Sequence, residues 1–304
     1  MPPTFFLVLS AALLSLGSVV AKGLLDGGLG LGLQPIAPLP FLTCQLAGSL
    51  ILLALLAARR RGGFALGSAA RVLNMTGLVS GVAALGTILA LSFMPVGEAS
   101  VIFATQPIVI LILARLLLGE QIRLRVALLS LLAVLGVVVI LTGAVEGTAT
   151  DRRLGAAFAL LATVAAAAYV VWMRQVSGAT HPLAALFRVQ AIGCLAAALA
   201  WAVGIAFAWP QAALPSPFSA LAAGGTGALY YGVAFYVYLI GLARMEAGRA
   251  GVFLTLVPVF SIALAALLLG ERFAAIQWMG AAVVLAALFA LSRRARPKAC
   301  PANP

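Results

Sequence analysis

Three polar residues recur on one face of the first apolar run in this sequence. Ser15, Ser18 and Lys22 stand at i, i+3 and i+7, so an α-helix would place them in one stripe. Polar groups inside an apolar environment need a partner or a water-filled space. In such a space the hydroxyls would supply hydrogen bonds, and the Lys22 ammonium near the mouth would attract a carboxylate. The alternative is that Lys22 reaches an aqueous interface and the serines bond to their own helix.

Aromatic residues form a second pattern. Tyr231, Phe235 and Tyr238 stand at i, i+4 and i+7, and Tyr169 and Trp172 form a similar pair at i and i+3. The positions that correspond to the first three in an earlier run hold small residues: Ser80, Ala84 and Thr87. One half of the molecule would therefore offer aromatic faces for binding, and the other would offer room. Packing or an interfacial belt is the alternative.

Two prolines lie in the middle of apolar runs, and Gln106 directly precedes the first of them. Pro107 and Pro258 each remove a backbone donor and free a carbonyl one turn back, which kinks a helix. The pattern predicts two bending points that could serve a gate, with Gln106 in the binding space. A static kink with Gln106 as an interhelical hydrogen-bonding residue is the alternative.

Acidic residues are missing from the centres of the apolar runs. All seven stand at run ends or in loops: Asp26, Glu98, Glu120, Glu146, Asp151, Glu246 and Glu271. With one histidine and three cysteines, the chain has no cluster for acid–base or metal chemistry. We therefore expect no enzyme, no metal and no cofactor. A desolvated cation would also lack a buried counter-charge, so a zwitterion or carboxylate suits Lys22 and the aromatic residues better.

The composition places these residues in a lipid bilayer. Of 304 residues, 64% are hydrophobic and 9% are charged, and the mean hydropathy is +1.18. Apolar runs of helix-spanning length follow one another, without the alternation typical of barrel strands. The predicted spans are 4–25, 38–58, 72–92, 98–118, 124–144, 154–176, 182–204, 219–242, 248–269 and 274–292.

The basic residues indicate topology rather than a nucleic-acid partner. The net charge is +12, but the basic residues lie at run ends. With the N-terminus inside, thirteen of the nineteen fall on the cytoplasmic side: Arg59, Arg60, Arg61, Arg71, Arg123, Arg125, Arg174, Arg244, Arg249, Arg293, Arg294, Arg296 and Lys298. This bias predicts cytoplasmic termini, with a basic tail at 293–304. The sequence leaves open whether Arg188 points inward or outward.

One pentapeptide occurs twice, and it reveals a duplication. LLLGE occupies 116–120 and 267–271, and at the same offset several other residues coincide: Met94 with Met245, Gly97 with Gly248, and Pro107 with Pro258. Each half then holds five helices, over 1–147 and 148–292. Because five is odd, the halves must enter the membrane in opposite directions. Inverted repeats of this kind are typical of transporters with a site near the bilayer midplane.

The doubled five-helix pattern, with a mid-helix proline followed by leucines and Gly-Glu, resembles the EamA-type drug/metabolite transporter superfamily. The segment from Leu16 to Lys22 also resembles the first-helix signature of that family, with Leu16 in place of the usual aromatic. The resemblance implies an all-α membrane protein of ten helices in a bacterial-type cytoplasmic membrane. It also implies a central cavity lined mainly by the first, third and fourth helices of each repeat.

The resemblance further implies export of amino acids, metabolites or toxic compounds. Taken with the residues above, it predicts a secondary transporter that exports small metabolites, foremost amino acids including aromatic ones, by rocking of the two repeats. The runner-up is a multidrug exporter of lipophilic or quaternary cations. A channel or scaffold is a further alternative, which would show no saturable exchange. The expected partners are a small-molecule substrate and the lipid bilayer, and the sequence leaves the oligomeric state open.

Overall fold

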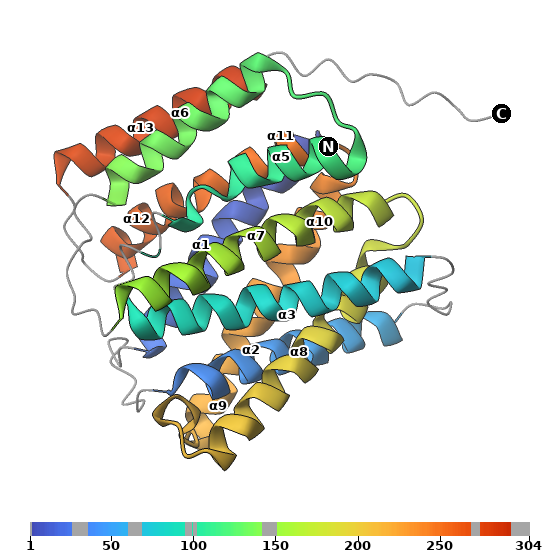
Figure 1. The fold of residues 1–304 in the computed structure, drawn as a ribbon, viewed down its shortest axis with the longest axis vertical. Coiled ribbons are helices and arrows are strands. Elements are labelled where there is room, and N and C mark those ends of the chain that lie inside the picture. Colours follow the sequence, from blue (N-terminus) through green and yellow to red (C-terminus); the bar gives the residue numbers. More distant parts are fainter. Residues whose placement is uncertain are drawn as a thin grey trace.

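The structure, a computed structural model, describes residues 2–25, 36–59, 69–94, 99, 102–141, 151–268 and 274–292, and their regular elements are all helical (Figure 1). The elements are α1 (Pro3–Leu25), α2 (Pro38–Ala58), α3 (Ala70–Phe93), α5 (Gln106–Leu118), α6 (Leu124–Leu141), α7 (Arg152–Val176), α8 (Pro182–Ala206), η2 (Pro210–Ala212), α9 (Pro217–Gly227), η3 (Ala228–Ala234), α10 (Phe235–Leu242), α11 (Ala247–Val252), η4 (Phe253–Thr255), α12 (Leu256–Leu268) and α13 (Ala275–Ser292).

Taken as continuous rods, these elements confirm the ten predicted spans. In the described residues, six helical stretches are long and apolar enough to cross a membrane unaided. The shorter apolar helices are α5, α6, α13 and the first part of the rod α11–η4–α12. The exterior remains strongly apolar, since Leu116, Leu221 and Leu267 are each more than 70% exposed. Monomeric soluble proteins rarely show such surfaces, whereas a bilayer covers them with lipid.

The spans predicted at 98–118 and 248–269 are broken rather than continuous. α5 begins only at Gln106, after a turn at 104–105, and η4 interrupts the second rod just before Pro258. Proline has no N–H and its ring clashes with the carbonyl of the preceding turn, so the α-helical bonding pattern cannot pass through it. Thr105 and Thr255 each donate a hydrogen bond of 2.7 Å to the carbonyl three residues back, closing both breaks alike.

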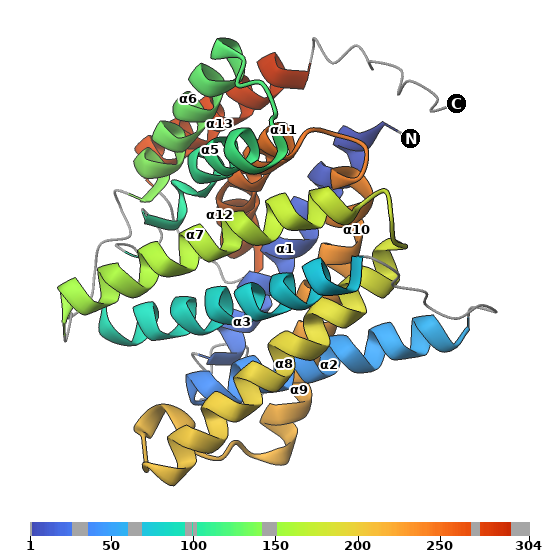
Figure 2. The ribbon, with the colours of Figure 1, turned by 45° about the vertical axis from the view of Figure 1, so that its right-hand side comes forward.

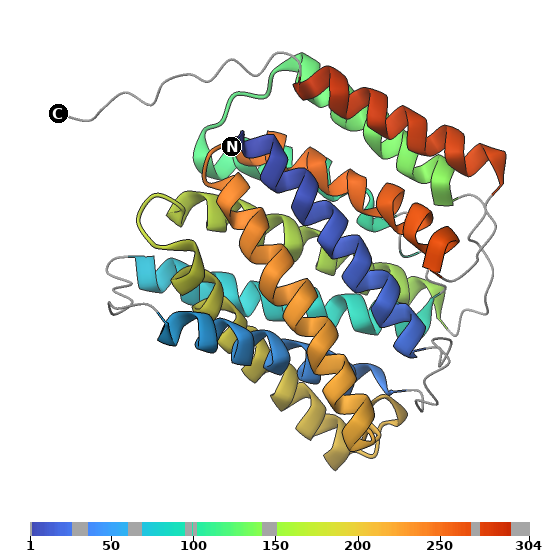
Figure 3. The same ribbon diagram turned by 180° about the vertical axis from the view of Figure 1, so that it is seen from behind.

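The two repeats interleave, so that most packing joins helices of different halves of the sequence. α3 packs against α7 and α8, and α5 packs against α7. In the same way, α1 packs against α10 and α12, and α2 packs against α9. Figure 3 shows α1 beside the rod that contains α10. We name α3, α5, α7 and α8 the first bundle, and α1, α2, α9–η3–α10 and α11–η4–α12 the second bundle.

Two contacts contribute most to the packing between the bundles, and a separate helix pair lies beside them. α2 crosses α8, and α5 contacts α11. α6 and α13 form a separate pair along one side, visible in Figures 1 and 2. Gly136 and Gly280 let the backbones of this pair approach, because a Cβ on either glycine would come within 3 Å of the other's carbonyl oxygen.

The direction of the helices confirms that the repeats are inverted. α5 ends on the right of Figure 1, while its counterpart α12 ends on the left. α1 begins on the same side as α13 ends (Figure 3). The end of α5 also lies on the side of Arg59, Arg71 and Arg174, whereas Arg152 starts α7 on the opposite side. Glu271, the counterpart of Glu120, lies outside the described residues.

Candidate functional site

An aromatic cluster lies where α7 meets the rod α9–η3–α10. The rings of Tyr231 and Phe235 stack with centroids 5.8 Å apart, and the Tyr169 ring of α7 meets Phe235 edge-on at the same distance. Tyr230 contacts both Tyr231, at 4.8 Å, and Phe235, at 5.8 Å. Tyr231 and Phe235 therefore share a face, and Tyr169 joins them from the first bundle. Their part in binding stays a prediction.

Tyr230 belongs to this cluster because its segment is a π-helix. η3 covers Ala228–Ala234, and a π turn holds more residues than the α turn that sequence spacing assumes. Tyr230 and Phe235, five residues apart, consequently share a face. The 3.6-residue periodicity assigned Tyr230 to another face, and the adjacent aromatic pair Tyr230-Tyr231 was the only sequence signal for it. Single π turns often occur at functional sites.

Side chains from both bundles hold the π segment. Gln190 of α8 donates from Nε2 to the Tyr231 carbonyl at 3.2 Å, and Ser10 of α1 donates to the Ala234 carbonyl at 2.8 Å. Gly232 faces α2, where a Cβ would lie 3.0 Å from Leu52 and 3.6 Å from the Ser49 hydroxyl. Two backbone carbonyls of this irregular turn, those of Tyr231 and Ala234, thereby gain side-chain donors inside the membrane protein.

Four buried polar atoms around this region have no hydrogen-bond partner in the described structure. They are the hydroxyls of Tyr169, Tyr238 and Ser49, and Oε1 of Gln190. Because buried polar atoms are almost always paired, each of these four atoms is a candidate for a hydrogen bond with a polar ligand. The three hydroxyls can donate or accept, and the amide oxygen can accept.

The first-helix stripe divides between two roles. Ser18 donates to the Leu14 carbonyl at 2.8 Å, within its own helix, which is the alternative that the sequence left open. Ser15 donates to the Val257 carbonyl at 2.8 Å and thus fixes α1 to α12. Gly17 makes room for Tyr230, since a Cβ there would lie 3.1 Å from the Tyr230 Cβ. The Lys22 side chain lies outside the described part of the structure, so both of its predicted roles stay predictions.

The other candidates occupy less decisive positions. Ser80, Gln106 and Trp172 are half-buried on α3, α5 and α7, and their part in binding stays a prediction. Pro107 and Pro258 flank the two helix breaks described above. Ala84 of α3 packs in the same apolar cluster as Tyr231. The room expected opposite the aromatic residues stays a prediction.

Several residues outside the cluster have structural roles. Arg188 is exposed and donates from Nε to Asn74 Oδ1 at 2.9 Å, so it points outward. His181 caps α8 by accepting from the Leu183 N–H through Nδ1, which makes it a turn residue. Gly77 and Gly81 admit Ile192 and Ala196 of α8, as the small-residue spacing predicts.

The described residues offer no group of three His, Cys, Asp or Glu side chains that could hold a metal. A wide apolar groove of about 710 Å³ lies elsewhere, between α1, α12 and α13, and is lined by Phe5, Phe253, Phe260, Phe289 and aliphatic residues. It shares no residue with the aromatic cluster. The cluster around η3 is therefore the best candidate for recognising a polar solute.

Gln190 and Ser49, like Tyr230, are residues that sequence reasoning left out of the site. The repeat pairs Gln45 with Gln190 and Gly48 with Gly193, which marks these helices without showing where they point. In the structure, Gln45 donates from Nε2 to the Thr226 hydroxyl at 3.1 Å, just before η3. The second helix of each repeat thus approaches the site, in addition to the first, third and fourth helices that the family resemblance implies.

Comparisons with known proteins agree with this architecture. The profile of the EamA-like transporter family matches residues 2–142 and again 153–293. The predicted boundary at 147 and 148 lies between these segments and stays a prediction. "Uncharacterized transporter YetK" of Bacillus subtilis (strain 168) is 27% identical over 222 residues, which are 67% of this chain and 62% of that protein, so the match spans less than two thirds of its length.

A solved structure, described as "Crystal structure of protein", shares the fold with a TM-score of 0.74 and 22% identity, over 96% of this chain and 98% of that one. The two family matches cover nearly the whole chain and coincide with two inverted groups of five apolar rods. The protein therefore belongs to the EamA-like transporter family, as a multi-pass membrane transporter and not an enzyme.

Proposed function

We propose that this transporter exports small metabolites, foremost amino acids including aromatic ones, by alternating access to the site around η3. The observation that carries the proposal is the aromatic cluster beside four unpartnered buried polar atoms. An aromatic amino acid has a ring that can stack on Phe235 or Tyr231, and polar groups that can bond with tyrosyl hydroxyls and the Gln190 amide oxygen.

The charges favour a solute without net positive charge. Among the described carboxylates, Glu120, Asp151 and Glu246 all lie at helix ends, and the sequence places the remaining four at run ends or in loops. A lipophilic cation could still bind aromatic faces, but it would lose its hydration without gaining a counter-charge. A zwitterion brings its own compensating charge.

Interleaved packing changes which bodies would move. Separating the repeats as rigid units would break the α3–α7 and α1–α10 contacts, which bury much of the core. We therefore assign the rocking motion to the first and second bundles. Each contains helices of both repeats, and the aromatic cluster spans them, because Tyr169 is on α7 and Phe235 on α10.

The same proposal includes the orientation in the membrane. The side on which α2 and α7 end, with Arg59 and Arg174, would face the cytoplasm, as would both termini. Labelling single cysteines at Ala179, in the exposed turn after α7, and at Arg153, at the start of α7, with a membrane-impermeant maleimide tests this. In intact cells only position 153 should react. The reverse result would place the termini outside.

The function is tested by counterflow in proteoliposomes containing the purified protein. Labelled phenylalanine, threonine and a quaternary amine are offered separately against unlabelled counterparts. We expect saturable exchange of the amino acids. Exchange of the amine alone would instead establish the multidrug exporter, and unsaturable flux would indicate a channel.

A matched pair of variants ties transport to the site. Phe235→Leu removes the ring that stacks on Tyr231, whereas Phe218→Leu makes the same change on the exposed surface of α9. Losing one aromatic contact worth about 1 kcal/mol should raise the KM for phenylalanine about fivefold. Phe218→Leu should leave it unchanged. If the two variants changed the KM equally, the aromatic cluster would not be part of the binding site.

A further inference from the structure

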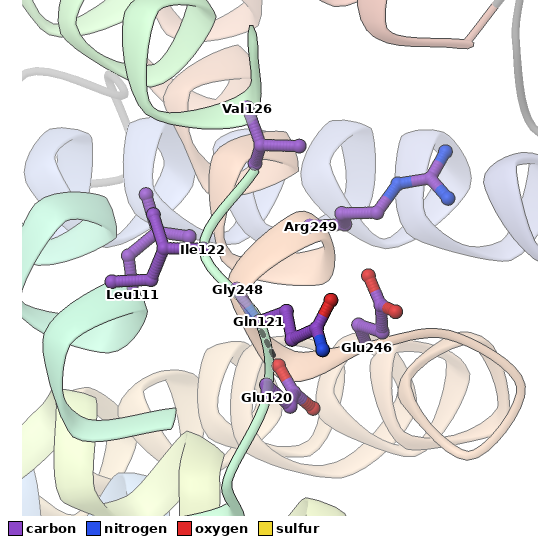
Figure 4. A pocket seen from close by; sticks show the side chains of 8 residues that line it. All are labelled: Leu111, Glu120, Gln121, Ile122, Val126, Glu246, Gly248 and Arg249. Atoms are coloured by element: carbon purple, nitrogen blue, oxygen red, sulfur yellow. Dashed lines mark hydrogen bonds between the residues drawn. The ribbon is translucent and has the colours of Figure 1, made fainter. Parts of the chain in front are cut away.

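Glu120, the last residue of the first LLLGE, binds the backbone of the opposite repeat. Gly119 ends α5 in the left-handed conformation, with φ of 68°, and turns the chain toward α11. Glu120 Oε1 accepts from the Ala247 N–H at 2.9 Å, and Oε2 accepts from the Gly248 N–H at 3.2 Å. Figure 4 shows this side chain directed at the α11 backbone.

The contact is strong for two reasons. The first N–H groups of a helix have no acceptor within it, and they carry a partial positive charge that favours a carboxylate. Hydrogen bonds with an ionised partner are also the stronger kind. Glu120 precedes α6 in the chain, but the helix start that its carboxylate binds is that of α11.

The surfaces around the carboxylate are closely packed. A Cβ on Gly248 would lie 2.5 Å from Leu111 Cδ2, so the absence of a side chain there lets α5 and α11 approach. The small cavity between Gln121, Arg249 and their neighbours has a volume of about 10 Å³, which is room for one water molecule at most. The two bundles are therefore closed against each other at this end (Figure 4).

This closure lies between the bodies to which we assign movement. α5 belongs to the first bundle and α11 to the second, and their contact is one of the few joining the bundles at the arginine-rich side. When two bodies rock about a central site, a contact between them at one end cannot persist in both conformations. The Glu120 hydrogen bonds must then break in the conformation that opens at this side.

We propose that Glu120 is a gating residue, whose carboxylate holds the arginine-rich side closed by binding the Ala247 and Gly248 N–H groups across the two bundles. The proposal rests on alternating access and is independent of which solute is carried. Removing the carboxylate should shift the conformational equilibrium toward the state open at this side, by about tenfold or more.

Cysteine cross-linking tests the gate. In a background with Cys44, Cys194 and Cys300 replaced by serine, Gln121→Cys and Arg249→Cys place two thiols beside the contact. A short bis-maleimide reports how often the bundles are closed here. Adding Glu120→Ala or Glu120→Gln should slow cross-linking about tenfold, and Glu120→Asp, one methylene shorter but still charged, should lie between these variants and the parent.

Glu246→Gln is the matched control, because Glu246 borders the same small cavity while Glu120 holds the α11 N–H groups. It should cross-link at the parental rate. A purely structural cap would lower the unfolding temperature of the Glu120 variants without changing cross-linking in folded protein, and that result would overturn the proposal. Should Glu120→Ala fail to fold, Glu120→Gln and Glu120→Asp carry the same comparison.

Cross-linking needs no substrate, so its outcome is separable from the substrate screen. Cross-linked protein should also lose whatever exchange the parent supports. Active counterflow with an unchanged cross-linking rate in the Glu120 variants would refute the gate while leaving the transport function intact. Altered cross-linking with no exchange of any tested solute would support the gate and remove only the proposed substrate class.

Discussion

Replacing Tyr169 or Tyr238 by phenylalanine should affect stability and substrate binding in opposite directions. Both side chains are buried, with 5% and 2% exposure, and neither hydroxyl has a partner in the described structure. Phenylalanine keeps the ring and removes only the oxygen. The change therefore tests what that oxygen does, with little disturbance of packing.

The magnitudes follow from hydrogen-bond energetics. A buried polar group without a partner costs about 1–3 kcal/mol. Each phenylalanine variant should thus leave the substrate-free protein equally stable, or stabilise it by about 1 kcal/mol. A hydrogen bond from the hydroxyl to substrate is worth about 0.5–1.5 kcal/mol net, so the KM should rise about two- to tenfold.

Two measurements on the same preparations check this. Thermal unfolding in detergent, without and with phenylalanine, gives stability and the stabilisation by ligand. Counterflow gives the KM. Tyr236→Phe is the control, because Tyr236 lies on the same helix as Tyr238, is half-buried and is not among the residues with unpartnered buried atoms. Tyr236→Phe should neither stabilise the substrate-free protein nor raise the KM for phenylalanine.

Two results would refute the reasoning. If a variant unfolds at a lower temperature without substrate, the tyrosyl hydroxyl that it lacks has a hydrogen-bond partner in the substrate-free parent protein. That hydroxyl is then not free to bind a ligand. If stability behaves as expected but the KM for phenylalanine stays the same, the hydroxyl lies outside the binding site. Either result would leave the aromatic rings as the remaining argument for substrate recognition.

Three other predictions concern the scaffold. Gly48→Ala should abolish folding or destabilise the protein by several kcal/mol, because its Cβ would overlap the Gly224 backbone, whereas Gly225→Ala, with open space around it, should be harmless by thermal unfolding. Pro258→Ala restores an N–H at the break before α12, and we expect folded protein with slower counterflow; an unchanged rate would make the break merely structural. Asp151→Ala removes the side chain that accepts from two N–H groups at the start of α7, and should lower stability by about 1 kcal/mol in chemical unfolding, with no change in KM.

The sequence determined the class of protein and its duplication. Apolar runs of spanning length force helices in a bilayer, because no other unclosed element satisfies its backbone there. An odd number of helices in each repeat then required inversion, which the opposite directions of α5 and α12 confirm. The spacing of Gly77 and Gly81 is also of the kind that favours close helix packing, and Ile192 and Ala196 lie against them in the structure.

The site was only partly predictable. Tyr231 and Phe235 were found because their spacing fits a helix face, but Tyr230 depends on a π turn that Gln190 and Ser10 support from distant helices. Side chains that pair over long sequence distances leave no periodic signal. The unpartnered state of Ser49 and Gln190 Oε1 is equally invisible in sequence, because it depends on what every neighbouring helix presents.

By itself, then, the sequence determined the bilayer environment, the ten helical spans and the inverted duplication, because these follow from hydropathy, length and parity. Only the tertiary structure decided that the repeats interleave into two mixed bundles, that Glu120 caps α11 rather than its own next helix, and that Arg188 faces outward. Such features depend on which helix surfaces fit together, and many arrangements of equally apolar helices share one hydropathy pattern.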